Sequence, residues 1–232
     1  MTLPAKVGIG VATLSSISAV SYVGKSYFSN SNYDSSKVID EQPQKIATSK
    51  LIEEKFEYIL LDSKTEGVNA DDKHWTEIWT AYKRDNANND VDPLNLKGWN
   101  KSKPSDLTAE LKKKCSDLSK EQILKDNKTH YQKVTKYCAR NVTIADHIKK
   151  DKLTAIDTSN AEGLWKTRES GKSAIEKYFT TLEITPTSEN NVTAENIKNG
   201  CKTTIEKSKK ESNYDAIYSA YKEVCVKKNG EQ

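Results

Sequence analysis

Two stretches decide the predicted fold of this chain: TAELKKKC at residues 108–115 and TAENIKNGC at residues 193–201, each ending in a cysteine. In both, a tyrosine and a second cysteine follow: Tyr131 with Cys138, and Tyr218 with Cys225. The chain has four cysteines, so all of them belong to this duplicated pattern. The duplication predicts an architecture and a disulfide framework, but it carries no reaction chemistry.

The repeat extends upstream of the cysteines. Similar residues occur in residues 49–59 and 146–156 at a constant offset of 97 positions (146 − 49), and a tryptophan follows in each copy, Trp75 and Trp165. The offset is smaller at the cysteines, so the second copy is shorter by a few residues, which loops tolerate. Two units of this size are too few for a solenoid and favour a pair of similar small helical subdomains.

Local signals place the first elements of each copy. Ser49 and Asp146 each precede a short helical stretch, and we expect both to act as N-caps because their side-chain oxygens can accept from the free amides of a first turn. Residues 56–61 are predicted to be extended, and residues 153–156 show the same pattern less clearly in the second copy.

An aromatic stripe at helical spacing follows in the first copy, where four residues recur at i, i+3, i+4 and i+7: Trp75, Ile78, Trp79 and Tyr82. This spacing puts them on one face of a helix, and we interpret that face as core. In the second copy the positions after Trp165 are polar, and an apolar stripe returns later: Ile175, Tyr178, Phe179 and Leu182.

Each cysteine continues the apolar face of a predicted helix. The first helix of each pair has apolar residues at i, i+4 and i+8: Leu107, Leu111 and Cys115, then Ile197, Cys201 and Ile205. The closing helices show the same feature: Tyr131, Val134 and Cys138, then Tyr214, Ile217, Tyr218, Tyr221 and Cys225. Two helices packed through these faces would bring the thiols of each copy together.

We therefore predict two disulfides, Cys115–Cys138 and Cys201–Cys225. Four cysteines allow three pairings, and only this one keeps each repeat self-contained. Each bridge should contribute about 3 kcal/mol, mainly by restricting the unfolded chain. The alternative is four buried reduced thiols, because cysteine also packs well as a small apolar residue.

The amino terminus contains an uncharged stretch between Lys6 and Lys25. As a helix it would be roughly 27 Å long, close to the hydrocarbon thickness of about 30 Å. A retained signal anchor is favoured, and a cleaved signal peptide is the alternative. The predicted domains are a signal anchor or signal peptide (1–24), a flexible stalk (25–45), repeat copy one (46–141) and repeat copy two (142–232). We expect contact with membrane lipid through residues 7–24 and export of the chain after Lys25.

Composition argues against a nucleic-acid partner. The net charge is +4, and acidic residues are interspersed among the lysines. Arginine, which reads phosphates and bases through paired hydrogen bonds, occurs only three times: Arg84, Arg140 and Arg168. Uptake of nucleic acid at the cell surface is the least favoured of the functions considered.

The sequence offers no catalytic, cofactor or metal motif. The 22 and 23 residues between the paired cysteines do not suit zinc, which needs clustered ligands. His74, His130 and His147 share no motif with a serine or cysteine nucleophile, so we read them as structural. Three Asn-x-Thr strings begin at Asn127, Asn141 and Asn191. They would accept glycans only in a eukaryotic secretory pathway.

Three features together resemble a known group of proteins: the leader MTLPAKVGIGVATL, the W-x-x-x-W-x-x-Y string from Trp75 to Tyr82, and the closing Tyr/Cys elements. They are similar to the large paralogous families of uncharacterised proteins in haemotropic mycoplasmas. In the second copy, Glu169 stands where those families often repeat a tryptophan. The resemblance implies a membrane-tethered, surface-exposed and antigenically variable protein of a wall-less parasite of red cells, and it carries no catalytic residue.

These observations favour a membrane-anchored, mainly helical extracytoplasmic protein, single-pass in the cell membrane with its C-terminal region outside. It is expected to bind a host or cell-surface protein or to present a surface, without catalysis and without a cofactor. A secreted enzyme with an unrecognised active site is the alternative.

Overall fold

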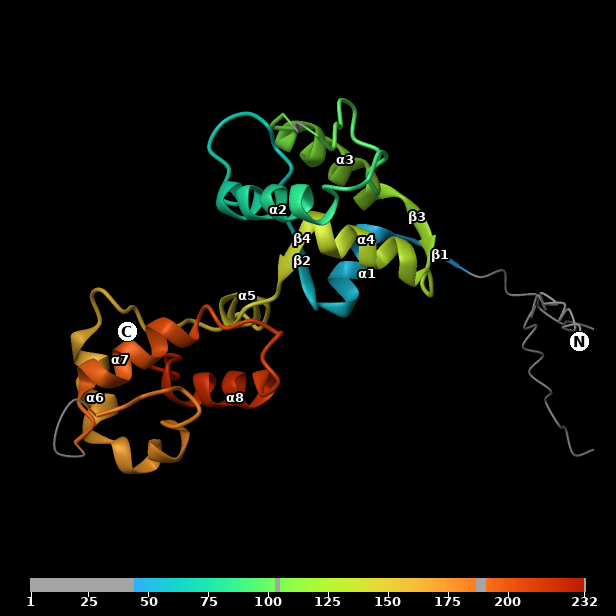
Figure 1. Ribbon diagram of the computed structural model, residues 1–232. Coiled ribbons are helices and arrows are strands. Elements are labelled where there is room, and N and C mark those ends of the chain that lie inside the picture. The colour runs from blue at the N-terminus through green and yellow to red at the C-terminus, as the bar shows by residue number, and fades with distance from the viewer. Residues whose placement is uncertain (1–43, 103–104, 187–190, 232) are drawn as a thin grey trace, which may run out of the picture. The chain divides into compact units, whose positions relative to one another are not determined.

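The computed structural model describes residues 44–102, 105–186 and 191–231 (Figure 1). They belong to one compact unit, residues 41–232. The predicted membrane segment, residues 7–24, lies outside the described residues, as does the predicted stalk up to residue 43. The last residue of that stalk, Lys45, is the first residue of a strand.

The described part of the chain is mainly helical, as the sequence predicts. Its α-helices are α1 (Thr48–Lys55), α2 (Asp72–Asp85), α3 (Thr108–Lys120), α4 (Lys128–Cys138), α5 (Ile144–Lys150), α6 (Glu162–Ser170), α7 (Ala194–Thr204) and α8 (Tyr214–Val224). Two short 3₁₀ turns, Lys172–Ala174 and Glu176–Tyr178, lie between α6 and α7.

The strands form two antiparallel pairs of three residues each. Strand β1 (Lys45–Ala47) pairs with β3 (Gln122–Leu124). Strand β2 (Tyr58–Leu60) pairs with β4 (Ala139–Asn141), with Tyr58 opposite Asn141. The predicted extended run at residues 56–61 therefore contains β2.

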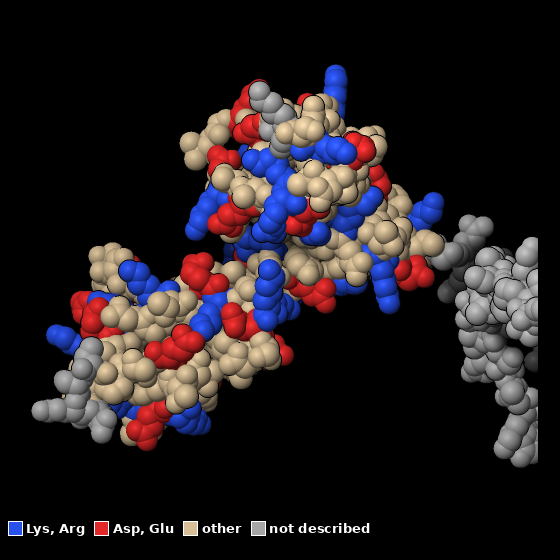
Figure 2. Space-filling model, viewed as in Figure 1, with Lys and Arg blue, Asp and Glu red and all other residues tan. Residues whose placement is uncertain are grey.

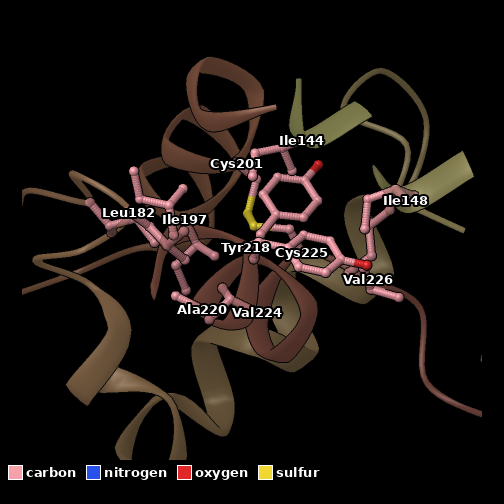
Figure 3. Packing of buried hydrophobic residues seen from close by; sticks show 14 of the residues in the cluster. Ile144, Ile148, Leu182, Ile197, Cys201, Tyr218, Ala220, Val224, Cys225 and Val226 are labelled. Carbon is pink, nitrogen blue, oxygen red and sulfur yellow. A yellow bond between two sulfur atoms is a disulfide. The ribbon is translucent and has the colours of Figure 1, made fainter. Parts of the chain in front are cut away.

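The buried apolar residues form two separate clusters. One is built from residues 51–138 around Trp75, Trp79 and Tyr82, so the aromatic stripe of α2 is core as predicted. The other is built from residues 144–226 (Figure 3). Each cluster contains one pair of cysteines.

The four cysteines form the two predicted disulfides. Cys115 is bonded to Cys138, with 5.4 Å between their Cα atoms, and Cys201 to Cys225, with 5.7 Å. No free cysteine remains. In the second cluster the bridge lies among Ile144, Tyr218 and the neighbouring apolar side chains (Figure 3). All four residues are nearly inaccessible to solvent because each continues the apolar face of its helix or helix end.

The two halves repeat the same backbone hydrogen bonds. In the first half, the N–H of Thr48, which starts α1, donates to the carbonyl of Glu121, just after α3 (3.0 Å). In the second half, the N–H of Ile144, which starts α5, donates to the carbonyl of Lys207, shortly after α7 (3.0 Å). A later amide donates to the second cysteine in both: Leu61 N–H to Cys138 O (3.0 Å) and Ile156 N–H to Cys225 O (2.8 Å). The tryptophans also match: Trp75 Nε1 donates to Asp62 O (2.8 Å) and Trp165 Nε1 to Asp157 O (3.0 Å).

These contacts correct the upstream register. The backbone pairs Thr48 with Ile144, an offset of 96 (144 − 48), and Leu61 with Ile156, an offset of 95 (156 − 61). The constant offset of 97 read from similar residues is therefore wrong by one or two positions. Similar side chains on a short amphipathic helix can be aligned one or two positions out of place, whereas matching backbone hydrogen bonds fix the alignment of the two halves.

The predicted helix caps are also wrong. Ser49 lies inside α1, and no side chain caps that helix. Asp146 is the third residue of α5, where it forms a capping box with Thr143: each side chain accepts from the other residue's backbone amide. The predicted stripe of the second copy forms the 3₁₀ turns and the turn after them, where Phe179 and Leu182 are buried.

Candidate functional site

A polar hollow surrounds the exposed face of the β2–β4 ribbon, and we call it the Tyr58 hollow. It consists of two chambers of about 780 and 630 Å³, which share Tyr58, Asn141 and Lys210. These volumes fall in the range of about 300–1,000 Å³ that is typical of ligand pockets. Both chambers are open to solvent.

Three walls meet at the Tyr58–Asn141 pair. Helix α2 contributes His74, Glu77 and Ile78, and α4 contributes Gln132, Thr135 and Lys136. The third wall is the segment 209–216, which leads into α8. The two strand residues lie directly opposite each other in the antiparallel ladder, so their side chains point to the same face of the ribbon.

The third wall is joined to the first half of the chain by specific contacts. Lys209 Nζ donates to the carbonyl oxygen of Phe56 (2.7 Å). The Phe56 ring also lies 3.8 Å from the ammonium of Lys150 and contacts the ring of His147, with 5.1 Å between ring centroids. Phe56 has φ 48°, a left-handed conformation that places its carbonyl at the end of α1 within reach of Lys209.

Charges in the lining of the Tyr58 hollow balance. Its basic residues are Lys136, Arg140, Lys209 and Lys210, and its acidic residues are Glu57, Glu77, Glu211 and Asp215. Several of these groups already have partners. Arg140 forms a two-pronged ion pair with Asp146 (2.5 and 2.9 Å), and Lys136 contacts Asp85 at 2.9 Å.

The ion pair between Arg140 and Asp146 shifts the pKa values of both groups. Burial alone would raise the pKa of Asp146, but hydrogen bonds from Arg140 and Thr143 hold that pKa below its ordinary value. The hydrogen bond from Asp146 raises the pKa of Arg140. Tyr131, behind Tyr58, donates to Glu57 (3.2 Å), and burial together with that carboxylate raises the pKa of the phenol.

Five neutral polar side chains in the lining have no hydrogen-bond partner among the described residues: Tyr58, Gln132, Asn141, Ser212 and Asn213. Tyr58 is half-buried, and its ring meets the ring of Tyr131 edge-on at 6.4 Å. The arrangement can therefore present one aromatic face and several amide and hydroxyl groups to a bound molecule.

The second half of the chain has a hollow in the equivalent place, which we call the Leu153 hollow. Its volume is about 290 Å³, and it is lined by Leu153, Val226, residues 227–229 and the end of α8. Leu153 lies two residues before Ala155, which pairs with Val226 as Leu60 pairs with Ala139. Leu153 thus stands where the first half has Tyr58, and Lys228 stands where it has Asn141.

The three histidines lie in different surroundings. Only His74 lines the Tyr58 hollow, 3.7 Å from Glu77. His130 contacts the hydroxyl of Thr48 (3.1 Å). His147 stacks on Tyr218 and contacts the hydroxyl of Tyr214, and burial followed by the charge of Lys209 lowers its pKa. In the described ranges no three His, Cys, Asp or Glu residues are placed to hold a metal ion.

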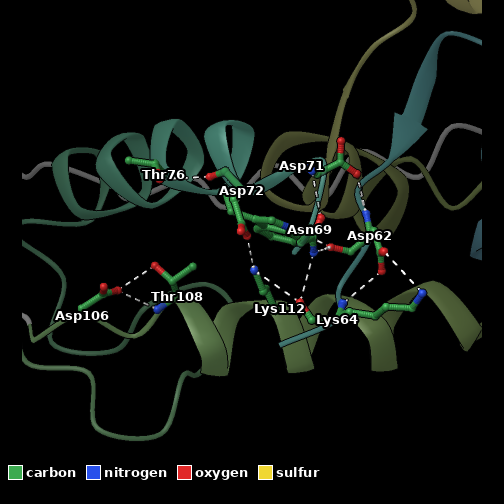
Figure 4. Close-up of polar contacts among 10 residues, drawn as sticks. Asp62, Lys64, Asn69, Asp71, Asp72, Thr76, Asp106, Thr108 and Lys112 are labelled. Carbon is green, nitrogen blue, oxygen red and sulfur yellow. Dashed lines mark hydrogen bonds and ion pairs between the residues drawn. The ribbon is translucent and has the colours of Figure 1, made fainter. Parts of the chain in front are cut away.

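A second polar network fixes the loop between β2 and α2 (Figure 4). The amide of the buried Asn69 donates to the carbonyls of Asp62 (2.7 Å) and Lys64 (3.1 Å). The nearly buried ammonium of Lys112 donates to Asp72 (2.8 Å). Every polar group in this network is used to hold the loop, so we read it as structural.

The rest of the visible surface shows no concentrated charge. On the face drawn in Figure 2, basic and acidic side chains alternate over the described residues. The Asn-x-Thr asparagines are dispersed: Asn127 caps α4, Asn141 lies in β4, and Asn191 accepts from Lys172 (2.5 Å).

Comparison with known proteins gives no relative. No protein-family model, no curated protein and no solved structure matches this chain. The resemblance to proteins of haemotropic mycoplasmas stays a prediction. Among the described helices, none has the length and apolar character needed to cross a bilayer.

Sequence reasoning missed the residues of the Tyr58 hollow. It placed Tyr58 in an extended run and considered Asn141 only as the start of an Asn-x-Thr string. The available signal was the position of Tyr58 in a predicted strand, because period-2 alternation puts it on a different face from Ile59. The third wall had no local signal, since Lys209 and Phe56 are 153 positions apart.

Proposed function

We propose that this chain is a membrane-tethered extracytoplasmic protein that acts by binding a partner at the cell surface, without catalysis. Residues 7–24 would contact membrane lipid, and residues 46–141 and 142–232 would form two tandem copies of one disulfide-clasped helical unit. The binding surface would include the Tyr58 hollow.

The two buried disulfides carry this proposal. Disulfides form and persist in oxidising compartments and are rare in the cytosol. Both bridges lie inside a hydrophobic cluster and join helices that pack through their apolar faces. A chain that depends on such bridges is expected to fold outside the cytoplasm, which agrees with the uncharged amino-terminal stretch.

The matched contacts of the two halves support a duplication. Both units use the same amide to reach the second cysteine and the same indole hydrogen bond. A doubled unit can keep one copy as scaffold while the other diverges, as the difference between Tyr58 and Leu153 suggests. A binding role is supported by an open hollow whose free groups include several neutral hydrogen-bonding side chains.

Labelling of intact cells tests the location. A membrane-impermeant amine reagent should modify exposed lysines such as Lys50, Lys64 and Lys97 in cells that express the chain. A cytosolic protein of the same cells is the control and should be labelled only after lysis. If those lysines react only after lysis, the extracytoplasmic assignment is wrong.

Intact-mass measurement of the native protein tests the rest. The mass should lie four hydrogen atoms below that of the reduced chain, since two disulfides are present. The same spectrum reports whether residues before the stalk are retained. A mature chain that lacks residues 1–24 would contradict the anchor and support the cleaved signal peptide.

A further inference from the structure

We propose that the Tyr58 hollow binds a neutral oligosaccharide. This rests on the proposed function, because it names the ligand class of that binding surface. The ribbon presents Tyr58 and Asn141 on one face, between walls from α2, α4 and the segment 209–216.

Charge selects an uncharged ligand. The lining of the Tyr58 hollow holds four lysine or arginine side chains and four carboxylates, so it offers no net attraction to an anion or a cation. Arg140 is held by Asp146, and Lys209 donates to Phe56 O. The charged groups of the lining that have no partner among the described residues, Lys210, Glu211 and Asp215, include both signs, so a ligand of either charge would meet a like charge beside the opposite one.

The free groups suit hydroxyls. The amides of Gln132, Asn141 and Asn213 and the phenol of Tyr58 can each donate and accept hydrogen bonds, and none has a partner within the described ranges. A sugar presents hydroxyls around a ring, and each hydroxyl also donates and accepts. An open, hydrated hollow allows waters to bridge the remaining contacts.

The floor suits a pyranose ring. The ring of Tyr58 is half-exposed in the shared part of both chambers, with its edge fixed by Tyr131. An aromatic side chain combines a large apolar face with a polar tip. A sugar ring has one face of C–H groups that can lie on such a surface while its hydroxyls reach the amides. Two chambers of similar size on either side of this ring have room for more than one sugar unit.

The Leu153 hollow supports the assignment by contrast. It has the same place in the second unit, but leucine replaces the aromatic floor and lysine replaces Asn141. Its lining holds Lys222, Lys227 and Lys228 against one carboxylate, Glu223, so it is basic. The duplicated fold therefore supplies an internal comparison in which the features required for sugar binding are missing.

Saturation-transfer NMR and calorimetric titration test the proposal on the purified full-length chain with its disulfides intact. The probes are neutral oligosaccharides of galactose, glucose and N-acetylglucosamine with two to four units, with sialyllactose as the acidic comparator and an uncharged extended peptide as a second comparator. The expected result is saturable transfer from at least one neutral oligosaccharide, with weaker binding of sialyllactose and none of the peptide.

Two variants and one control locate the site. Tyr58→Leu introduces the residue of the Leu153 hollow, and Gln132→Ala removes an exposed amide; each should weaken binding about tenfold or more. Asn229→Ala removes an exposed amide from the Leu153 hollow and should leave binding unchanged. Gln132 and Asn229 are both exposed, so neither substitution should disturb folding.

Three outcomes would overturn the proposal: no binding of any neutral oligosaccharide at millimolar concentration, preferential binding of the peptide, or binding that Gln132→Ala leaves intact. These outcomes do not affect the location of the chain. The labelling of intact cells reports location without reference to any ligand, so failure of the sugar site and failure of the proposed function are separable.

Discussion

Alanine at Gly200 should destabilise the protein although it replaces a glycine inside a helix. A Cβ atom at Gly200 in α7 would lie 2.3 Å from Cγ1 of Ile184 and 3.1 Å from the carbonyl oxygen of Leu182. Ile184 is buried, and its amide is fixed by a hydrogen bond to Phe179 O (2.9 Å), so the neighbour cannot move away cheaply. Overpacking of this kind costs about 1–3 kcal/mol.

The helix propensity acts in the opposite direction. Replacing glycine by alanine inside a helix stabilises it by about 1 kcal/mol. The overlap should dominate because it involves a buried side chain and a backbone carbonyl. We expect the Gly200→Ala variant to lose about 0–2 kcal/mol of unfolding free energy once the propensity gain is deducted.

Gly163 provides the matched control. It lies in α6, and a Cβ atom there would meet nothing within 4 Å. Gly163→Ala should therefore stabilise the protein by about 0.5–1 kcal/mol through propensity alone. Urea denaturation followed by circular dichroism, with the disulfides intact, gives both values. If Gly200→Ala raises the urea midpoint as Gly163→Ala does, the close packing of α7 against the preceding segment is wrong.

Two further predictions concern the second half of the chain. Replacing Cys201 and Cys225 together by serine should lower the unfolding free energy by about 3 kcal/mol, since the bridge closes a loop of this length; an unchanged urea midpoint would contradict a native bridge. The hydrogen bond from Arg168 lowers the pKa of Glu231 from 4.5 to about 2. Because the folded pKa is the lower one, this carboxylate stabilises the fold above pH 4.5, and the contribution is lost as the pH falls toward 2. Glu231→Gln should cost about 1 kcal/mol at neutral pH, given solvent screening, and should flatten the acid limb of the stability profile measured by thermal unfolding.

The features that were predictable depend on local periodicity. The burial of the cysteines followed from each cysteine continuing an apolar helix face, and the pairing followed because it alone keeps each predicted repeat self-contained. The buried stripe from Trp75 to Tyr82 followed in the same way. The capping box at Thr143 was also present in the sequence as a threonine three residues before Asp146, but attention to the aspartate alone misplaced the cap.

The features that were missed depend on residues far apart in the chain. Tyr58 and Asn141 meet because β2 and β4 pair, and no periodicity in either segment reports that pairing. The third wall of the Tyr58 hollow comes from residues 209–216, in the second half of the chain. The error of one residue in aligning α1 with α5 has the same cause. Only the hydrogen bond from Thr48 to Glu121, which are far apart in the chain, shows which residue of α1 corresponds to the start of α5.

Arg168 differs from its counterpart in the first half of the chain because it binds the segment that follows α8. Trp165 matches Trp75, so Arg168 stands at the position of Ile78, which packs against the first cluster. After Cys138 the chain continues as β4, which pairs with β2. After Cys225 the chain forms an isolated bridge between Val226 and Ala155, and Arg168 binds the carbonyl of Val226.

The Arg168 guanidinium attaches the segment around Cys225 to α6. Arg168 is nearly buried and donates to the carbonyls of Val224 and Val226, each at 3.0 Å, and to both carboxylate oxygens of Glu231. An apolar residue at this position could pack, but it could not satisfy two carbonyls and a carboxylate at once. The polar residue in the apolar stripe of α6 is therefore explained by the two carbonyls and the carboxylate that it binds.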